Sequence, residues 1–160
     1  RVAIGTGSTS GVTHPNADRL IEEVKRRGLA SDPNMRQALM RLYSEETTKS
    51  LVSMRTRAEL KAGRTPGPGG SLGKLHGAVI SRMMRTLIGE VFGIELVANN
   101  EGDKAELWGT IMLTSFSANI AGGTDEIQKN IIGDRVLGLP REPMVDKDLP
   151  FKDLKVGTQR

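Results

Sequence analysis

Apolar residues recur at helical spacing along most of the chain, and the segments between them are polar or rich in glycine and proline. The pattern predicts a short amphipathic helix that Asn16 caps and that stops at Gly28, followed by a long helix over 32–63. An earlier helix over about 1–9 is predicted to break at His14-Pro15. In the long helix, the residues expected to face the core are Met35, Leu39, Leu42, Tyr43, Leu51, Met54 and Ala58.

The segment 64–70 is a predicted loop, because two prolines and three glycines in seven residues cannot continue a helix. The next helix, over 72–92, carries two adjacent apolar stripes, so we expect either burial by several neighbours or a surface that pairs subunits. Polar residues 99–103 precede a helix over about 107–116, and a last helix is predicted over 125–137. The stripes are Leu72, Leu75, Val79, Met83, Leu87 and Val91, and Ile80, Met84, Ile88 and Phe92; the helix over 107–116 is marked by Leu107, Trp108, Ile111, Met112 and Phe116.

These elements predict an all-α protein, an up-and-down bundle of four main helices with one shorter helix at the start. No βαβ pattern or internal repeat competes with this fold. Aromatic residues make up only 3% of the chain, so the core is expected to consist of aliphatic side chains and methionine, which favours packed helices. We predict one bundle domain over 1–140 and an extended carboxy-terminal tail over 141–160.

Charge and composition exclude several classes of function. The net charge is +4, but the 23 basic residues are scattered among 19 acidic ones, so we predict no nucleic-acid partner and interpret Arg26-Arg27, Arg55 and Arg57 as solvated helix surface. The chain has no cysteine, which excludes disulfides and Cys-based zinc sites and is typical of a cytoplasmic protein. No apolar run reaches the roughly 18 to 20 residues of a membrane span. His14 and His76 are single and far apart, so no metal site is predicted.

The segment 121–137, AGGTDEIQKNIIGDRVL, combines a small-residue loop with a helix start. Gly122 and Gly123 lack Cβ atoms, so another group can approach the backbone closely. Thr124 is the predicted cap of the helix, whose first amides lack partners within it and carry the positive end of the dipole. The pattern fits a docking site for a phosphate or a carbonyl, and it equally fits a capped helix without a ligand.

The sequence of this segment, GGTDEIQKNIIGDRVLGLP, closely resembles the last core helix of acyl-CoA dehydrogenases. The resemblance extends to Ser31-Asp32-Pro33 before one long helix, and to Gly70-Ser71 and Lys74-Leu75 in another. It implies the carboxy-terminal helical domain of a longer FAD-dependent enzyme of lipid metabolism. That enzyme would also have an amino-terminal helical domain and a middle β domain, so we expect the chain to be cut at Arg1.

The resemblance also implies site residues. In the family, a carboxylate removes the α proton of an acyl-CoA thioester while flavin accepts hydride from the β carbon. Thr124 and Glu126 match positions that touch flavin, and Gly123 matches backbone that lies against the thioester. Gly122 occupies the position where many members have the catalytic Glu. Other members have that Glu directly before a stretch similar to RVAIG, so the base is expected either just upstream of Arg1 or in a partner subunit.

The resemblance implies partners as well: an acyl-CoA substrate, an electron-transfer acceptor, and a homo- or hetero-tetramer formed through the bundle. Two family motifs that reach the flavin of a neighbouring subunit are missing, with Arg26-Arg27-Gly28-Leu29 and Phe92-Gly93-Ile94-Glu95 near their places. This departure favours a divergent or mixed tetramer. Three interpretations therefore stand: a catalytic subunit, a non-catalytic partner subunit of the same fold, and a helical interaction module.

Overall fold

The computed structural model describes residues 16–64, 67, 69–98, 103–141 and 149–154. These residues form helices joined by short turns and include no strand. The predicted helix over 1–9, the break at His14-Pro15 and most of the polar turn over 99–103 lie outside the described residues. The elements are α1 (Ala17–Arg26), η1 (Leu29–Ser31), α2 (Pro33–Lys61), α3 (Gly70–Phe92), α4 (Glu95–Ala98), α5 (Asp103–Thr114), η2 (Ser117–Asn119), α6 (Asp125–Arg135) and η3 (Phe151–Asp153), where η denotes a 3₁₀ turn.

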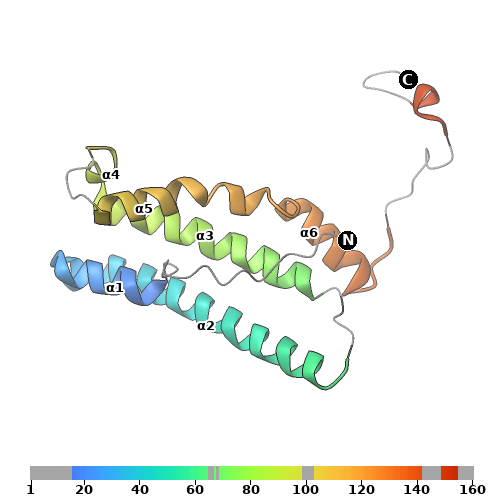
Figure 1. The fold of residues 1–160 in the computed structure, drawn as a ribbon, viewed down its shortest axis with the longest axis horizontal. Helices are drawn as coiled ribbons and strands as arrows, with labels where there is room; N and C mark the ends of the chain where they lie inside the picture. The colour runs from blue at the N-terminus through green and yellow to red at the C-terminus, as the bar shows by residue number, and fades with distance from the viewer. Residues whose placement is uncertain (1–15, 65–66, 68, 99–102, 142–148, 155–160) are drawn as a thin grey trace.

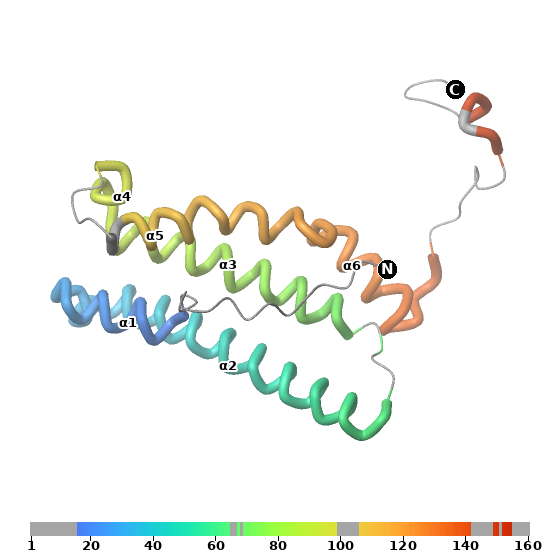
Figure 2. The backbone as a smooth tube through the Cα atoms, viewed as in Figure 1, coloured from blue at the N-terminus to red at the C-terminus, as the bar shows by residue number. Residues whose placement is uncertain are grey.

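The central element is α3. Figure 1 shows α1 and α2 on one side of it, and α5 and α6 following one another along its other side. Residue contacts agree, since α3 packs on α2, α5 and α6. The smooth trace in Figure 2 shows the same up-and-down path from α2 to α3 to α5 and α6. The predicted helical bundle is confirmed. The stripe residues from Ile80 onward are largely buried between neighbours, whereas Leu72, at the start of the helix, is 43% exposed.

The boundaries of the first two helices follow the predicted signals. The Asn16 side chain accepts a hydrogen bond from the backbone N–H of Arg19, and Gly28 ends the segment with a left-handed φ of 72°. Asp32 caps α2 by accepting from the amides of Asn34 and Met35. The core comprises Ala17, Leu20, Val24, Met35, Leu39, Leu42, Ile80, Met84, Leu87, Ile88, Val91, Phe92 and Trp108.

Four residues of α2 that were predicted to face the core are exposed. Tyr43, Leu51 and Met54 are 45%, 60% and 62% exposed, and Ala58 is exposed as well. For Leu51, Met54 and Ala58 the reason is length: α1 begins beside Glu46, where the Ala17 amide donates to the Glu46 carboxylate, and α2 continues 15 residues beyond that point, to Lys61. Tyr43 lies before that point and its exposure has no such explanation. Helical periodicity marked the apolar positions correctly, but it carries no information on where a neighbouring helix ends.

The later helices end earlier than predicted. Helix α5 stops at Thr114, where the hydroxyl groups of Thr114 and Ser115 bond to carbonyls of the preceding turn. As a result Phe116, expected in the core, is 55% exposed, and the Arg85 guanidinium lies over its ring at 4.2 Å. Helix α6 ends at Arg135 rather than Leu137. None of the described helices is long and apolar enough to cross a membrane.

Candidate functional site

The predicted docking loop is a tight turn between η2 and α6. Gly122 and Gly123 both have left-handed backbone, with φ of 74° and 102°. A Cβ atom on Gly123 would lie 2.7 Å from Gln128 Nε2, whereas one on Gly122 would meet nothing closer than Lys74 Cε at 3.6 Å. Gly123 therefore requires glycine for both conformation and space, and Gly122 requires it for conformation alone.

The first turn of α6 presents the two predicted flavin residues on neighbouring positions. The Thr124 hydroxyl accepts from the Ile127 amide at 3.5 Å, as a helix cap does. A hydrogen bond from its own backbone N–H, and then one from the Thr124 hydroxyl, hold the pKa of the Glu126 carboxyl below its ordinary value. Glu126 is exposed, so it presents an ionised acceptor to whatever docks at this turn.

A row of polar side chains on α3 holds this turn. Arg82 Nη1 donates to Asn119 Oδ1 at 2.7 Å and pairs with Asp125 Oδ2 at 2.7 Å. The Lys74 ammonium donates to the Ala118 carbonyl. Sequence reasoning missed this role, since a basic residue on a predicted helix face ordinarily indicates solvated surface. The available signal was that both basic residues lie on the helix predicted to be most buried.

A second anchor comes from α6 itself. Gln128 is buried at 5% exposure, and its Nε2 donates to the Gly122 carbonyl at 2.7 Å. The turn is thus bound from both α3 and α6. Gly123, Thr124 and Glu126, the three residues assigned from the resemblance, are presented together at this corner of the bundle.

A cleft of about 600 Å³ lies beside Gly122. Its volume is in the range of small-molecule sites. The charged side chains that line it are basic, Lys74 and Arg135. The rest of the lining is Gly67, Gly70, Ser71, Ala121, Gly122, Gln128 and Ile131.

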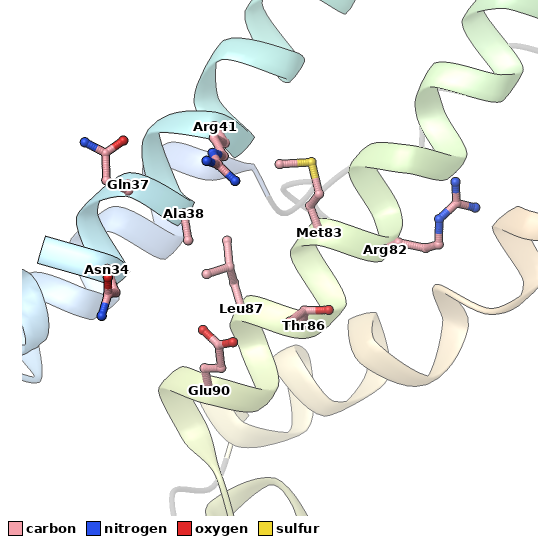
Figure 3. Close-up of a pocket in the computed structure, with 9 residues that line it drawn as sticks. All are labelled: Asn34, Gln37, Ala38, Arg41, Arg82, Met83, Thr86, Leu87 and Glu90. Carbon is pink, nitrogen blue, oxygen red and sulfur yellow. The ribbon is translucent and has the colours of Figure 1, made fainter. Parts of the chain in front are cut away.

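A separate cavity of about 470 Å³ lies between α2 and α3. Figure 3 shows Ala38 from α2 and Met83 and Leu87 from α3 around it, with polar side chains at the rim. Arg41 and Arg82 both border this cavity, but Arg82 points away from it in the view. This cavity is distinct from the cleft at the glycine turn.

Comparison with known proteins identifies the family of the chain. The model of the acyl-CoA dehydrogenase C-terminal domain matches residues 13–137, which include α1 to α6 and the glycine turn. The chain belongs to the acyl-CoA dehydrogenase family. It is 36% identical over 124 residues to acyl-CoA dehydrogenase IpdE1 of Mycolicibacterium smegmatis, and 35% identical over 127 residues to acyl-CoA dehydrogenase IpdE1 of Mycobacterium tuberculosis.

Each alignment covers 77% of this chain, and the chain spans about 30% of the length of these relatives. No solved structure matches the chain. This acyl-CoA dehydrogenase domain carries the motif GGTDEIQ at the turn into its last helix. Gly122, the first residue of this motif, has no side chain. It lines the cleft and lies next to the Lys74 side chain.

Arg27 corrects the prediction that Arg26-Arg27 is solvated surface. Its side chain is only 11% exposed, pairs with Glu23 and Glu95 at 2.6 Å each, and lies over the Phe92 ring at 4.3 Å. The two segments that stand near the missing family motifs are thus joined to each other through the Arg27–Glu95 pair. Arg27 acts within the domain as a packing and pairing residue.

Within the described residues, His76 stands apart from any cluster of metal ligands. No group of three or more His, Asp or Glu side chains there has a metal-binding arrangement. His76 instead pairs with Glu45 across α2 and α3. His14 lies outside the described residues.

Proposed function

We propose that this domain is part of a flavin-dependent acyl-CoA dehydrogenase that introduces an α,β double bond into an acyl-CoA thioester. In this proposal Thr124 and Glu126 contact FAD, and Gly123 lies against the thioester. The observation that carries it is the glycine turn, because family membership and tight backbone geometry coincide there. The proposed boundaries are the bundle over 1–140 and the tail over 141–160.

The residues at the turn fit a flavin better than a free anion. The first turn of α6 already carries Asp125 and Glu126, whose carboxylates balance the positive end of the helix dipole. Asp125 is neutralised by Arg82, so a phosphate at this turn would meet the ionised Glu126 carboxylate, whereas hydroxyl and ring N–H groups would find an acceptor in it. Bound FAD would supply the hydride acceptor, a role for which no amino-acid side chain is suited.

The described residues supply binding and orientation to the reaction. In this proposal the Gly123 backbone lies against the thioester, and hydrogen bonds to the thioester carbonyl would make its α proton more acidic. The Gly123 N–H itself donates to the Ile120 carbonyl at 3.1 Å, so those donors lie elsewhere in the site. The general base is proposed to lie outside the described residues, just upstream of Arg1 or in a partner subunit. We also propose that the protein acts in the cytoplasm with an electron-transfer acceptor.

The exposed apolar side chains of α2 support assembly through the bundle. Leu51, Val52, Met54 and Leu60 are each more than 40% exposed on one helix. Such apolar surface is typical of faces that another subunit covers. We propose a homo- or hetero-tetramer in which this half of α2 is buried.

Gly122 favours a second candidate function, a non-catalytic partner subunit. A glycine has no side chain that could take up a proton, so this position cannot supply the catalytic base. In that case the subunit contributes structure and half of a flavin site to an active partner.

The test is flavin absorbance of the full-length protein and its bleaching by acyl-CoA. Bleaching by the full-length protein alone supports the catalytic subunit, and bleaching only after addition of a second subunit supports the partner. Absence of flavin under both conditions would contradict both. The 160-residue chain alone is expected to be helical by circular dichroism, to bind flavin weakly or not at all, and to show no dehydrogenation.

A further inference from the structure

The glycine turn has little apolar packing to fix it. Phe116, Ile120 and Ile127, the large apolar side chains that flank it, are all more than half exposed. Two consecutive glycines also make this backbone intrinsically more flexible than any other dipeptide. Its conformation must therefore be held by polar contacts: the backbone hydrogen bond from the Gly123 N–H to the Ile120 carbonyl at 3.1 Å, and side-chain anchors from the neighbouring helices.

Arg82 contacts both flanks of the turn through one nitrogen. Nη1 carries two hydrogens, and its partners are Asn119 Oδ1 before the glycines and Asp125 Oδ2 after them, each at 2.7 Å. Asn119 is itself anchored, because its Nδ2 donates to the Ser115 carbonyl at 3.1 Å. The Arg82 bracket, defined as Arg82, Asn119 and Asp125, therefore fixes the distance between the end of η2 and the start of α6.

The other two anchors act on one flank each. Lys74 binds the carbonyl of Ala118, before the turn, and Gln128 binds the carbonyl of Gly122, inside it. The Arg82–Asp125 pair is also partly shielded from water, with side-chain exposures of 38% and 17%. A charge-assisted bond in such a place is stronger than an exposed ion pair.

We propose that Arg82 is a positioning residue for the flavin and thioester site: its bracket holds Gly123, Thr124 and Glu126 in the arrangement that both ligands require. The inference rests on the proposed function of the turn. It adds a residue on a different helix, which touches neither ligand and acts through Asn119 and Asp125.

The experiment compares Arg82→Gln with Arg41→Gln in the full-length protein, assembled with its partner subunit if it needs one. Arg41 is a matched control, because it borders the same cavity from α2 (Figure 3), while the side-chain anchors of the turn come from α3 and α6. Hydrogen exchange over 118–128 reports on the turn without reference to flavin. Flavin content and the rate of bleaching by acyl-CoA report on the site.

For Arg82→Gln we expect roughly tenfold faster exchange over 118–128 and roughly tenfold slower bleaching, with the thermal midpoint changed by no more than about 3 °C. Arg82→Lys should restore part of both, since an ammonium can also donate to two acceptors. Arg41→Gln should match the unaltered protein. A loss of thermal stability alone, with unchanged bleaching per bound flavin, would show a merely structural role and overturn the inference.

Asn119→Ala covers the case in which Arg82→Gln does not fold. It removes one arm of the bracket, keeps the Arg82–Asp125 pair, and is expected to change exchange and bleaching in the same direction by a smaller factor. If the unaltered protein holds no flavin, the proposed function fails, while the exchange data still decide whether Arg82 holds the turn. If flavin is present and neither variant alters exchange or bleaching, the inference about Arg82 fails and the proposed function stands.

Discussion

The two ends of α3 are held in different ways. Its carboxy-terminal end, around Ile88, Val91 and Phe92, is buried among apolar side chains of α1, α2 and α5. Its amino-terminal and central part, from Lys74 to Arg82, holds the glycine turn through these two side chains. One end is fixed by burial, and the other is fixed by hydrogen bonds to a flexible segment.

This difference separates stability from function along one helix. Burying a large aliphatic side chain stabilises a protein by roughly 1.5 to 3 kcal/mol, while a typical hydrogen bond contributes about 1 kcal/mol net. The buried end therefore carries the folding energy. The turn end contributes less to folding energy, and its hydrogen bonds instead set the arrangement of the turn.

The largest expected effect tests the buried end. Leu42 is fully buried and Leu51, on the same helix, is 60% exposed. Leu42→Ala should lower the free energy of unfolding by about 3 to 4 kcal/mol, because it leaves a cavity, whereas Leu51→Ala should change it by less than about 0.5 kcal/mol. Urea unfolding of the chain followed by circular dichroism measures both. Equal losses would mean that α2 is covered along its whole length.

The ion cluster of Glu23, Arg26 and Arg27 makes the free energy of unfolding depend on pH. Hydrogen bonds from Arg26, and then Arg27, hold the pKa of Glu23 at about 2 against burial, which raises it. Because this pKa is depressed in the folded state, the stabilisation is present above pH 4.5, the ordinary value, and is lost as pH falls toward 2. At neutral pH it amounts to about 3 kcal/mol, since a tenfold change in proton affinity corresponds to about 1.4 kcal/mol.

The Glu23 contribution is isolated by comparing the unaltered chain with Glu23→Gln. Urea unfolding at a series of pH values measures the free energy of unfolding of both proteins. The unaltered chain should be more stable by about 3 kcal/mol at neutral pH, and this difference should disappear between pH 4.5 and 2. Two parallel stability curves would contradict the assignment, because other carboxyls would then account for the pH dependence.

The smallest expected effects test the turn end. Gly123→Ala should destabilise by about 2 kcal/mol, since it forces a left-handed φ of 102° on alanine and displaces Gln128 from the Gly122 carbonyl. Gly122→Ala should cost only about 1 kcal/mol, because its Cβ has room. Thermal unfolding of both variants checks the order. A reversed order would mean that the cleft beside Gly122 is closed in solution.

The sequence predicted those features that depend on local pattern. Helical periodicity located α2 and α3. The predicted cap Asn16 and the predicted start of the long helix at residue 32 marked the starts of α1 and α2 correctly. The exposure of Leu51 and Met54 was not predictable, because it depends on where a neighbouring helix ends. The prediction for Arg27 was wrong for a similar reason: its partner Glu95 is distant in sequence and is brought near only by packing.

The candidate site was predictable in part. The motif GGTDEIQ pointed to the turn, and the structure supplies a tight glycine pair and a capped helix start there. The roles of Lys74 and Arg82 were not predicted, because hydrogen bonds between a helix and a distant loop leave no periodic signal. The roles of Gly123, Thr124 and Glu126 toward flavin and thioester stay predictions.

The proposed roles of these residues all depend on whether the turn between η2 and α6 receives flavin and thioester. A cryo-EM or crystal structure of the intact assembly with FAD and an acyl-CoA ligand decides this. We expect Thr124 and Glu126 within hydrogen-bond distance of the flavin, and the Gly123 backbone against the thioester. A turn that faces bulk solvent, or a subunit contact without cofactor, would refute the proposal.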